Sequence, residues 1–117
     1  MKILLTARGI ELDDDLKGYV VRRIQFALGR YAAKIKSLSI RLEDVNGPKG
    51  GIDKGCQIRV DAGFAQKVII LERSETVHAA AANAIERVER SVERHLSLAR
   101  TAGRRPARLR ADFGFGG

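Results

Sequence analysis

The chain has 117 residues, of which 22 are Lys or Arg and 14 are Asp or Glu, so its formal net charge is +8. This length suits one small domain with a two-layer core, and the charge favours a polyanionic partner, nucleic acid first among them. A basic surface that only keeps the protein in solution is the plain alternative. Apolar runs such as VIIL are far shorter than the ~20 residues of a membrane-spanning helix, and no export signal is evident, so we expect a cytoplasmic protein without membrane contact.

The N-terminal part of the chain predicts a strand, a helix and a second strand. KILLTA mixes apolar and β-branched residues without a helical period, as short strands do. Asp13, Asp14 and Asp15 then supply the side-chain oxygens and negative charge that favour the start of a helix. The apolar side of this helix comprises Leu16, Val20, Ile24, Ala27, Leu28 and Tyr31. LSIRLEDV alternates apolar and polar residues, which predicts a strand with one wet face.

The rest of the chain predicts two more strands and a long helix. After a glycine-rich loop, NGPKGGIDKG, the segments CQIRVDAGF and AQKVIILER complete an antiparallel meander, and a helical period runs from about Ser74 to Ala99. We therefore predict an α+β domain of order β-α-β-β-β-α over residues 1–102, with two helices on one face of a four-stranded sheet and the other face solvated. Residues 103–117 are basic and glycine-rich, which predicts a disordered tail.

The first predicted helix carries cations and aromatic rings beside its apolar stripe. At 100° per residue, Arg22, Arg23 and Arg30 fall within about 100° of Tyr19 and Phe26. Arginines can fork onto phosphates and exposed rings can stack on bases, a combination that suits RNA better than smooth duplex DNA. The alternative is that both rings pack at the margin of the core and the arginines are only solvated.

The second predicted helix sorts its charges by sign. One flank holds Arg87, Arg90 and Arg94, and the neighbouring flank holds Glu86, Glu89 and Glu93. Such segregation leaves one flank for phosphate and repels phosphate at the other, so the acidic flank would orient docking, although a merely solvated helix face is the plain alternative. The further candidates for phosphate contact are Arg100, Arg104 and Arg105 beyond this helix, and Lys49 and Lys54 in the glycine-rich loop.

No enzymatic constellation is evident in the sequence. His78 and His95 are too far apart to form a metal pair on one helical face, and GPKGG lacks the GK[ST] ending of a phosphate-binding loop. The single cysteine, Cys56, excludes an internal disulfide and predicts a small buried side chain on a strand. We expect no catalytic residue, no metal, no cofactor and no small-molecule substrate.

Several phrases resemble, in order, the ribosome hibernation-promoting factor and ribosome-associated inhibitor family, which is sigma-54 modulation protein-like. They are L..YV..R from Leu16 to Arg23, GRY from Gly29 to Tyr31, and AIERVERSV in the second helix. The resemblance spans roughly Met1 to Arg100 and is to the short form, which has no second domain. The chain departs from the family pattern at Thr76, His78 and Ala82, where the family has an acidic residue, an aromatic residue and Asp.

This resemblance implies a fold similar to double-stranded-RNA-binding domains. It also implies docking in the small ribosomal subunit, in the channel used by mRNA and tRNA, so that translation is held off during stress or stationary phase. Carried over by position, the contacts would come from Arg22, Arg23, Arg30, Lys49, Lys54, Arg87, Arg90 and Arg94. A module that forms a homodimer and a general RNA-binding protein without ribosome preference are the alternatives. Salt separates phosphate binding, which salt weakens, from an apolar dimer, which salt strengthens.

Overall fold

The computed structural model describes residues 1–44, 53–62 and 67–104, with only the backbone for 98–104. Its elements are, in chain order, β1 (Lys2–Arg8), α1 (Asp14–Leu28), the 3-10 helix η1 (Gly29–Lys34), β2 (Ile35–Asp44), β3 (Lys54–Ala62), β4 (Val68–Ser74) and α2 (Val77–Arg104). The predicted order of strands and helices, β-α-β-β-β-α, is therefore confirmed.

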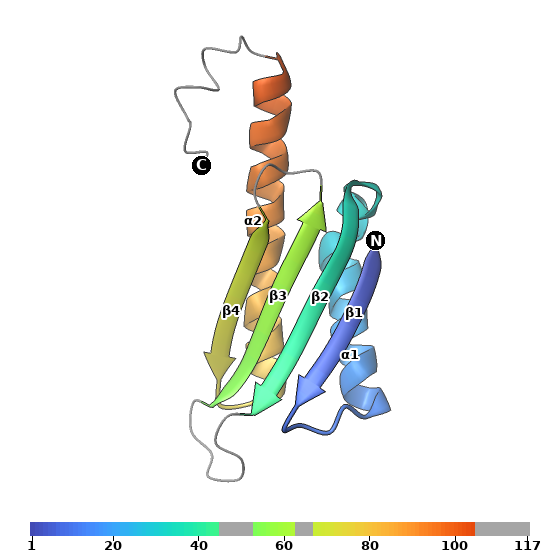
Figure 1. Ribbon diagram of the computed structural model, residues 1–117, viewed down its shortest axis with the longest axis vertical. Coiled ribbons are helices and arrows are strands. Elements are labelled where there is room, and N and C mark those ends of the chain that lie inside the picture. Colours follow the sequence, from blue (N-terminus) through green and yellow to red (C-terminus); the bar gives the residue numbers. More distant parts are fainter. Residues whose placement is uncertain (45–52, 63–66, 105–117) are drawn as a thin grey trace.

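The four strands form one mixed sheet in the order β1-β2-β3-β4. β1 runs parallel to β2, whereas β2 with β3 and β3 with β4 are antiparallel, as the predicted meander requires. A parallel pair needs a crossover connection, which α1 and η1 supply. Both helices lie on the same face of the sheet, α1 behind β1 and β2 and α2 behind β3 and β4 in Figure 1. The two-layer arrangement predicted from the sequence is confirmed, and the opposite face of the sheet carries no described helix.

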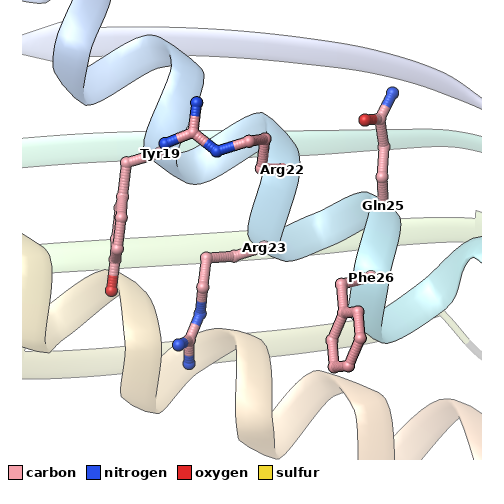
Figure 2. A pocket seen from close by; sticks show the side chains of 5 residues that line it. All are labelled: Tyr19, Arg22, Arg23, Gln25 and Phe26. Carbon is pink, nitrogen blue, oxygen red and sulfur yellow. The ribbon is translucent and has the colours of Figure 1, made fainter.

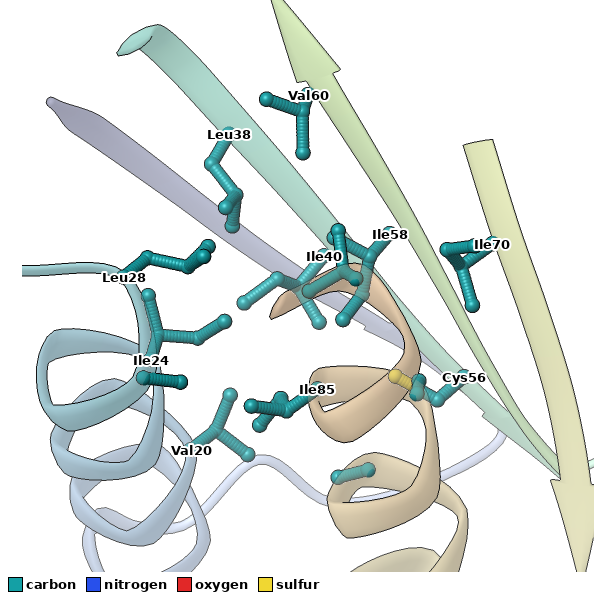
Figure 3. Close-up of a cluster of buried hydrophobic side chains, with 14 of the residues drawn as sticks. Val20, Ile24, Leu28, Leu38, Ile40, Cys56, Ile58, Val60, Ile70 and Ile85 are labelled. Atoms are coloured by element: carbon teal, nitrogen blue, oxygen red, sulfur yellow. The ribbon is translucent and has the colours of Figure 1, made fainter. Parts of the chain in front are cut away.

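The core lies between the sheet and the apolar stripes of the two helices (Figure 3). Strand residues alternate between this layer and solvent, so that Leu38, Ile40 and Leu42 of β2 are fully buried. The helix residues that meet them are Val20, Ile24 and Leu28 of α1 and Ala80, Ala81, Ala84, Ile85, Val88 and Val92 of α2. Three small alanines let the first turns of α2 approach the strands closely, which places the flanks of this helix near the edge of the sheet.

Capping residues set the start of both helices. Asp13 Oδ1 accepts the N–H of Leu16 at 2.8 Å, so the acidic cluster begins α1 as predicted. Thr76 Oγ1 accepts the N–H of Ala79 at 3.1 Å and begins α2 in the same way. Thr76 is one of the positions that depart from the family pattern, and its hydroxyl supplies the oxygen that an acidic residue would offer there.

Both α-helices end at residues other than those predicted from the hydrophobic periodicity of the sequence. Tyr31 continues the apolar stripe of the first helix in the sequence, but it lies on η1, where it is half-buried. The second helix runs to Arg104 instead of ending near Ala99, because a single Gly103 costs a helix only about 1 kcal/mol relative to Ala. The first residues assigned to the tail, 103 and 104, are therefore helical, and 105–117 lie outside the described residues.

Ile24 and Phe26 lie two residues apart on α1 but on opposite sides of it. Ile24 is 0% exposed, whereas Phe26 is 93% exposed. We expect Ile24→Ala to lower the free energy of unfolding by about 2–5 kcal/mol, because it removes three carbons from the centre of the core. Phe26→Ala should change it by no more than about 0.5 kcal/mol, because its ring loses no packing. Urea denaturation followed by circular dichroism measures both. Equal losses for the two variants would contradict the position of α1 on the sheet.

Candidate nucleic-acid interface

The outer side of α1 carries a cationic surface with an exposed ring. Figure 2 shows its five side chains, all from this helix, which are Tyr19, Arg22, Arg23, Gln25 and Phe26. Arg22 and Arg23 are exposed, and Phe26 is the most exposed large apolar residue of the described chain. The guanidinium of Arg22 lies back over Gly18, where a β-carbon would come within 3.1 Å of its Nη1. Two exposed guanidinium groups beside an open ring could provide phosphate and stacking contacts on one surface, which we call the α1 surface.

Tyr19 and Phe26, which the helical period places together, have different environments. The ring of Tyr19 is half-buried and packs against the ring of His78 on α2, with centroids 4.7 Å apart. The guanidinium of Arg23 lies 5.8 Å from the centroid of the Tyr19 ring. Packing at the core margin, the alternative considered for both rings, therefore holds for Tyr19, while Phe26 stays open to solvent.

The arginine flank of α2 lies over the β4 edge of the sheet. Arg87, Arg90 and Arg94 line a shallow depression with Ile70 of β4 and Ser91. We call this group of three arginines the α2 surface. It does not present three equivalent cations, because Arg87 pairs with Glu72 of β4 and its Nη1 also donates to the carbonyl oxygen of Leu71 at 3.4 Å. Arg87 thus ties the helix to the edge strand, and Arg90 and Arg94 are the two exposed members that make no ion pair within the described residues.

The acidic flank of α2 faces Arg30 of the 3-10 helix η1. Glu89 Oε2 and Glu93 Oε2 lie 3.4 Å and 3.7 Å from Nη2 of Arg30, whose guanidinium also lies 4.9 Å from the centroid of the Tyr31 ring. Arg30 is therefore engaged by two carboxylates, although its side chain stays 60% exposed and such exposed pairs contribute only about 0–1 kcal/mol. The sorting of charges on α2 has a structural reason, since one flank meets Arg30 and the other meets β4.

Lys54 is the first residue of β3 instead of a loop residue, and it is held inside an ionic cluster. Its Nζ lies 2.9 Å from Asp53 Oδ1 and 3.4 Å from Asp44 Oδ2, and only 17% of its side chain is exposed. The hydrogen bond that Lys54 Nζ donates to Asp53, reinforced by the charges of both carboxylates, raises the pKa of Lys54 above its usual 10.5. Asp53 is itself 1% exposed, and its Oδ2 has no hydrogen-bond partner among the described residues. This geometry favours a structural role for Lys54 over contact with RNA.

The structure does not describe the side chains of the remaining cations predicted from the sequence to contact RNA. Lys49 and Arg105 lie outside the described residues. Arg100 and Arg104 lie on the last turns of α2, where the backbone alone is described, so they extend the same helix as the α2 surface.

The groups that could have supported chemistry are engaged or buried. Cys56 is fully buried on β3, and burial, followed by the charge of Glu72, raises the pKa of its thiol to about 12. His95 Nδ1 lies within hydrogen-bond distance of the Ser91 carbonyl oxygen, at 2.8 Å. Within residues 1–44, 53–62 and 67–104 there is no group of three or more potential metal-ligating side chains, and no helix there is long and apolar enough to cross a membrane.

The family model described as sigma 54 modulation protein / S30EA ribosomal protein matches residues 3–98. The chain belongs to this family. The family is one of ribosome-associated proteins, as the sequence resemblance predicted.

Two solved structures of similar fold bear on this assignment. The N-terminal domain of Protein Y from Thermus thermophilus is 26% identical with a TM-score of 0.66, and the alignment covers 80% of this chain and 98% of that one. A ribosomal subunit interface protein from Coxiella burnetii is 12% identical with a TM-score of 0.69, covering 83% of this chain and 99% of that one, and it shows the shared fold alone. A comparison with curated protein sequences returned no significant match.

Two features of the charge distribution are not among the sequence predictions, namely the internal partners of the candidate cations and the cations of the strands. The partners of Arg30 and Arg87 lie 59 and 15 residues away in the chain, so no local pattern reveals them. The strand cations Arg41 and Arg59 could have been found, because they alternate with buried residues and so had to project from the open face of the sheet.

We expect Lys54→Gln to lower thermal stability, because it leaves the buried carboxylate of Asp53 without its cation. Since folding raises the pKa of Lys54, the stabilisation is complete below pH 10.5 and is lost as the pH rises further through the folded-state value. Thermal melts from neutral to alkaline pH measure the difference between the variant and the wild type. The double variant Asp53→Asn/Lys54→Gln is the control and should recover most of the loss. A Lys54→Gln protein of full stability and weakened RNA binding would instead make Lys54 a contact residue.

Proposed function

We propose that the protein binds the small ribosomal subunit in the channel used by mRNA and tRNA and inhibits translation by occupying that channel. The observation that carries this proposal is the pair of exposed arginine surfaces, one on each helix, in a chain of a ribosome-associated family. The proposed action needs no catalytic group, because phosphate contacts hold the domain and its bulk excludes other ligands. We place this action in the cytoplasm, during stress or stationary phase.

The two surfaces would contribute different kinds of contact. On the α1 surface, Arg22 and Arg23 supply phosphate contacts and Phe26 supplies a stacking face for one unpaired base. On the α2 surface, Arg90 and Arg94 supply charge without an accompanying ring. Contacts from two helices restrict orientation more than a single strip would, and the acidic flank between them disfavours phosphate at the helix seam.

A homodimer is the alternative that a specific observation supports. Ile69 and Leu71 of the edge strand β4 are 52% and 50% exposed, and an open edge strand can pair with a second copy. The carbonyl oxygen of Leu71, however, accepts a hydrogen bond from Arg87, which occupies one acceptor of that edge. Sedimentation velocity over a concentration series distinguishes a dimer from a monomer.

Co-sedimentation with separated small and large ribosomal subunits tests the proposed function. Between about 50 and 200 mM salt, binding that rests on phosphate contacts should fall steeply and should be confined to the small subunit. Equal binding to both subunits and to unrelated RNA would favour a general RNA-binding protein. A folded protein that binds neither subunit would refute the proposal.

We expect Arg90→Glu/Arg94→Glu to lower affinity for the small subunit by at least about 100-fold, because two charge-assisted contacts are each worth about 1.5–3 kcal/mol. The fold should persist, because both side chains are exposed and make no ion pair within the described residues. The matched control is Lys17→Glu/Lys34→Glu, which changes the net charge equally at exposed positions outside both surfaces. Equal losses in the two double variants would mean that net charge alone drives binding.

We expect Phe26→Ala to weaken small-subunit binding by about 5- to 150-fold, because stacking on one base is worth about 1–3 kcal/mol. Phe26→Trp should keep the affinity, since it keeps a flat ring. Phe26→Leu is the control, because it keeps an apolar side chain without a stacking face. Wild-type affinity in the alanine variant, measured by filter binding, would remove Phe26 from the interface.

A further inference from the structure

The face of the sheet turned away from the helices is strongly cationic, and none of the RNA contacts proposed above uses it. Within the described part of the chain, its outward side chains include six cations and two acids, namely Lys2, Arg8, Arg41, Arg59, Lys67 and Arg73 against Glu43 and Asp61. All six cations are exposed, and none of them forms an ion pair with another described residue. In contrast, Arg30, Lys54 and Arg87 on the helical side are each paired with carboxylates.

The strand register places three of these cations on one diagonal line. Arg8 on β1 is opposite Glu43 on β2, and Arg41 lies two residues before Glu43 on the same strand. Arg41 is opposite Gln57 on β3, and Arg59 lies two residues beyond Gln57. From one arginine to the next, the row therefore moves one strand across the sheet and two residues along the strand direction. This separates neighbouring cations by roughly 8 Å. One arginine per strand stands in an evenly spaced row across three strands.

A fourth cation extends this row to the last strand. Lys67 is exposed and directly precedes Val68, which pairs with Val60, the residue after Arg59. The other two cations of the face, Lys2 and Arg73, lie off the row at opposite corners of the sheet, on β1 and β4. Because strands in a hydrogen-bonded sheet hold their register, the spacing of the row is set before any ligand binds.

We propose that this row, Arg8, Arg41, Arg59 and Lys67, is a second RNA-binding surface that follows the phosphate backbone of one strand. The ligand is assigned by charge and spacing, since a nucleic-acid backbone is a polyanion with regularly spaced charges. The described part of this face carries no aromatic side chain, so it contacts phosphates without stacking on bases and binds independently of sequence. One part of this inference rests on the proposed function, namely that the bound polyanion is RNA.

The test uses a fluorescein-labelled 12-nucleotide oligouridylate and a background protein in which Arg22, Arg23, Arg90 and Arg94 are all replaced by Gln. Fluorescence anisotropy of this background should show residual binding that weakens with salt. Adding Arg41→Gln/Arg59→Gln should lower that affinity at least tenfold. It should also reduce the slope of log K against log salt by about 1.4, the value expected for two lost contacts to a single strand.

The matched control is Lys2→Gln/Arg73→Gln in the same background, which removes equal charge from the same face off the row. It should lower affinity less than threefold and leave the slope nearly unchanged. Equal losses in both variants, or no residual binding in the background, would overturn the inference. Circular dichroism establishes that every variant is folded. Failure of the proposed function is seen separately, as a wild-type protein that does not sediment with the small subunit.

Discussion

The packing of α2 on β3 and β4 is the constraint on which the charge distribution of this domain depends. With Ala84, Val88 and Val92 directed to the sheet, the helix has no rotational freedom left. Its glutamate flank must then face Arg30 on η1 and its arginine flank must lie over the edge of β4. The segregated charges of this helix therefore belong first to the fold, because each flank has a partner of opposite sign on the neighbouring element. Among the arginine side chains that the structure describes on this helix, Arg90 and Arg94 exceed this need and are left for an external polyanion.

The cations of the protein divide according to what it would cost to redirect them to a phosphate. An exposed ion pair contributes about 0–1 kcal/mol, so Arg30 can exchange its carboxylates for a phosphate with little loss of stability. Lys54 cannot, because its departure would leave the buried charge of Asp53 uncompensated. Arg87 is intermediate, since it is half exposed but also holds a backbone acceptor of β4. A count of basic residues therefore overstates the charge available for RNA, and the arrangement of their partners corrects it.

Hydrophobic periodicity was sufficient to predict the elements, their order and the two-layer packing, because each depends on local alternation between apolar and polar residues. The environment of individual site residues was not predictable in this way. Tyr19 and Phe26 share one side of α1, yet only Tyr19 meets a ring, that of His78, from another helix. The burial of Asp53 next to Lys54 was hidden by a glycine-rich segment that predicts an exposed loop. The cationic row needed the pairing of all four strands, which is information that no single strand contains.

The two sides of the domain differ in the specificity that they can provide. The helical side combines arginines with an exposed ring and interrupts them with acids, so in the proposed mode of binding it would favour one orientation and one kind of RNA structure. The sheet side offers an evenly spaced row without rings, which suits any strand in either direction. Because the Debye length is about 8 Å at physiological salt, each side acts mainly on the RNA in direct contact with it. In the proposed mode of binding, cations on both outer surfaces would let this two-layer domain contact two RNA walls of a narrow space at once, with the helices setting the orientation and the sheet adding affinity.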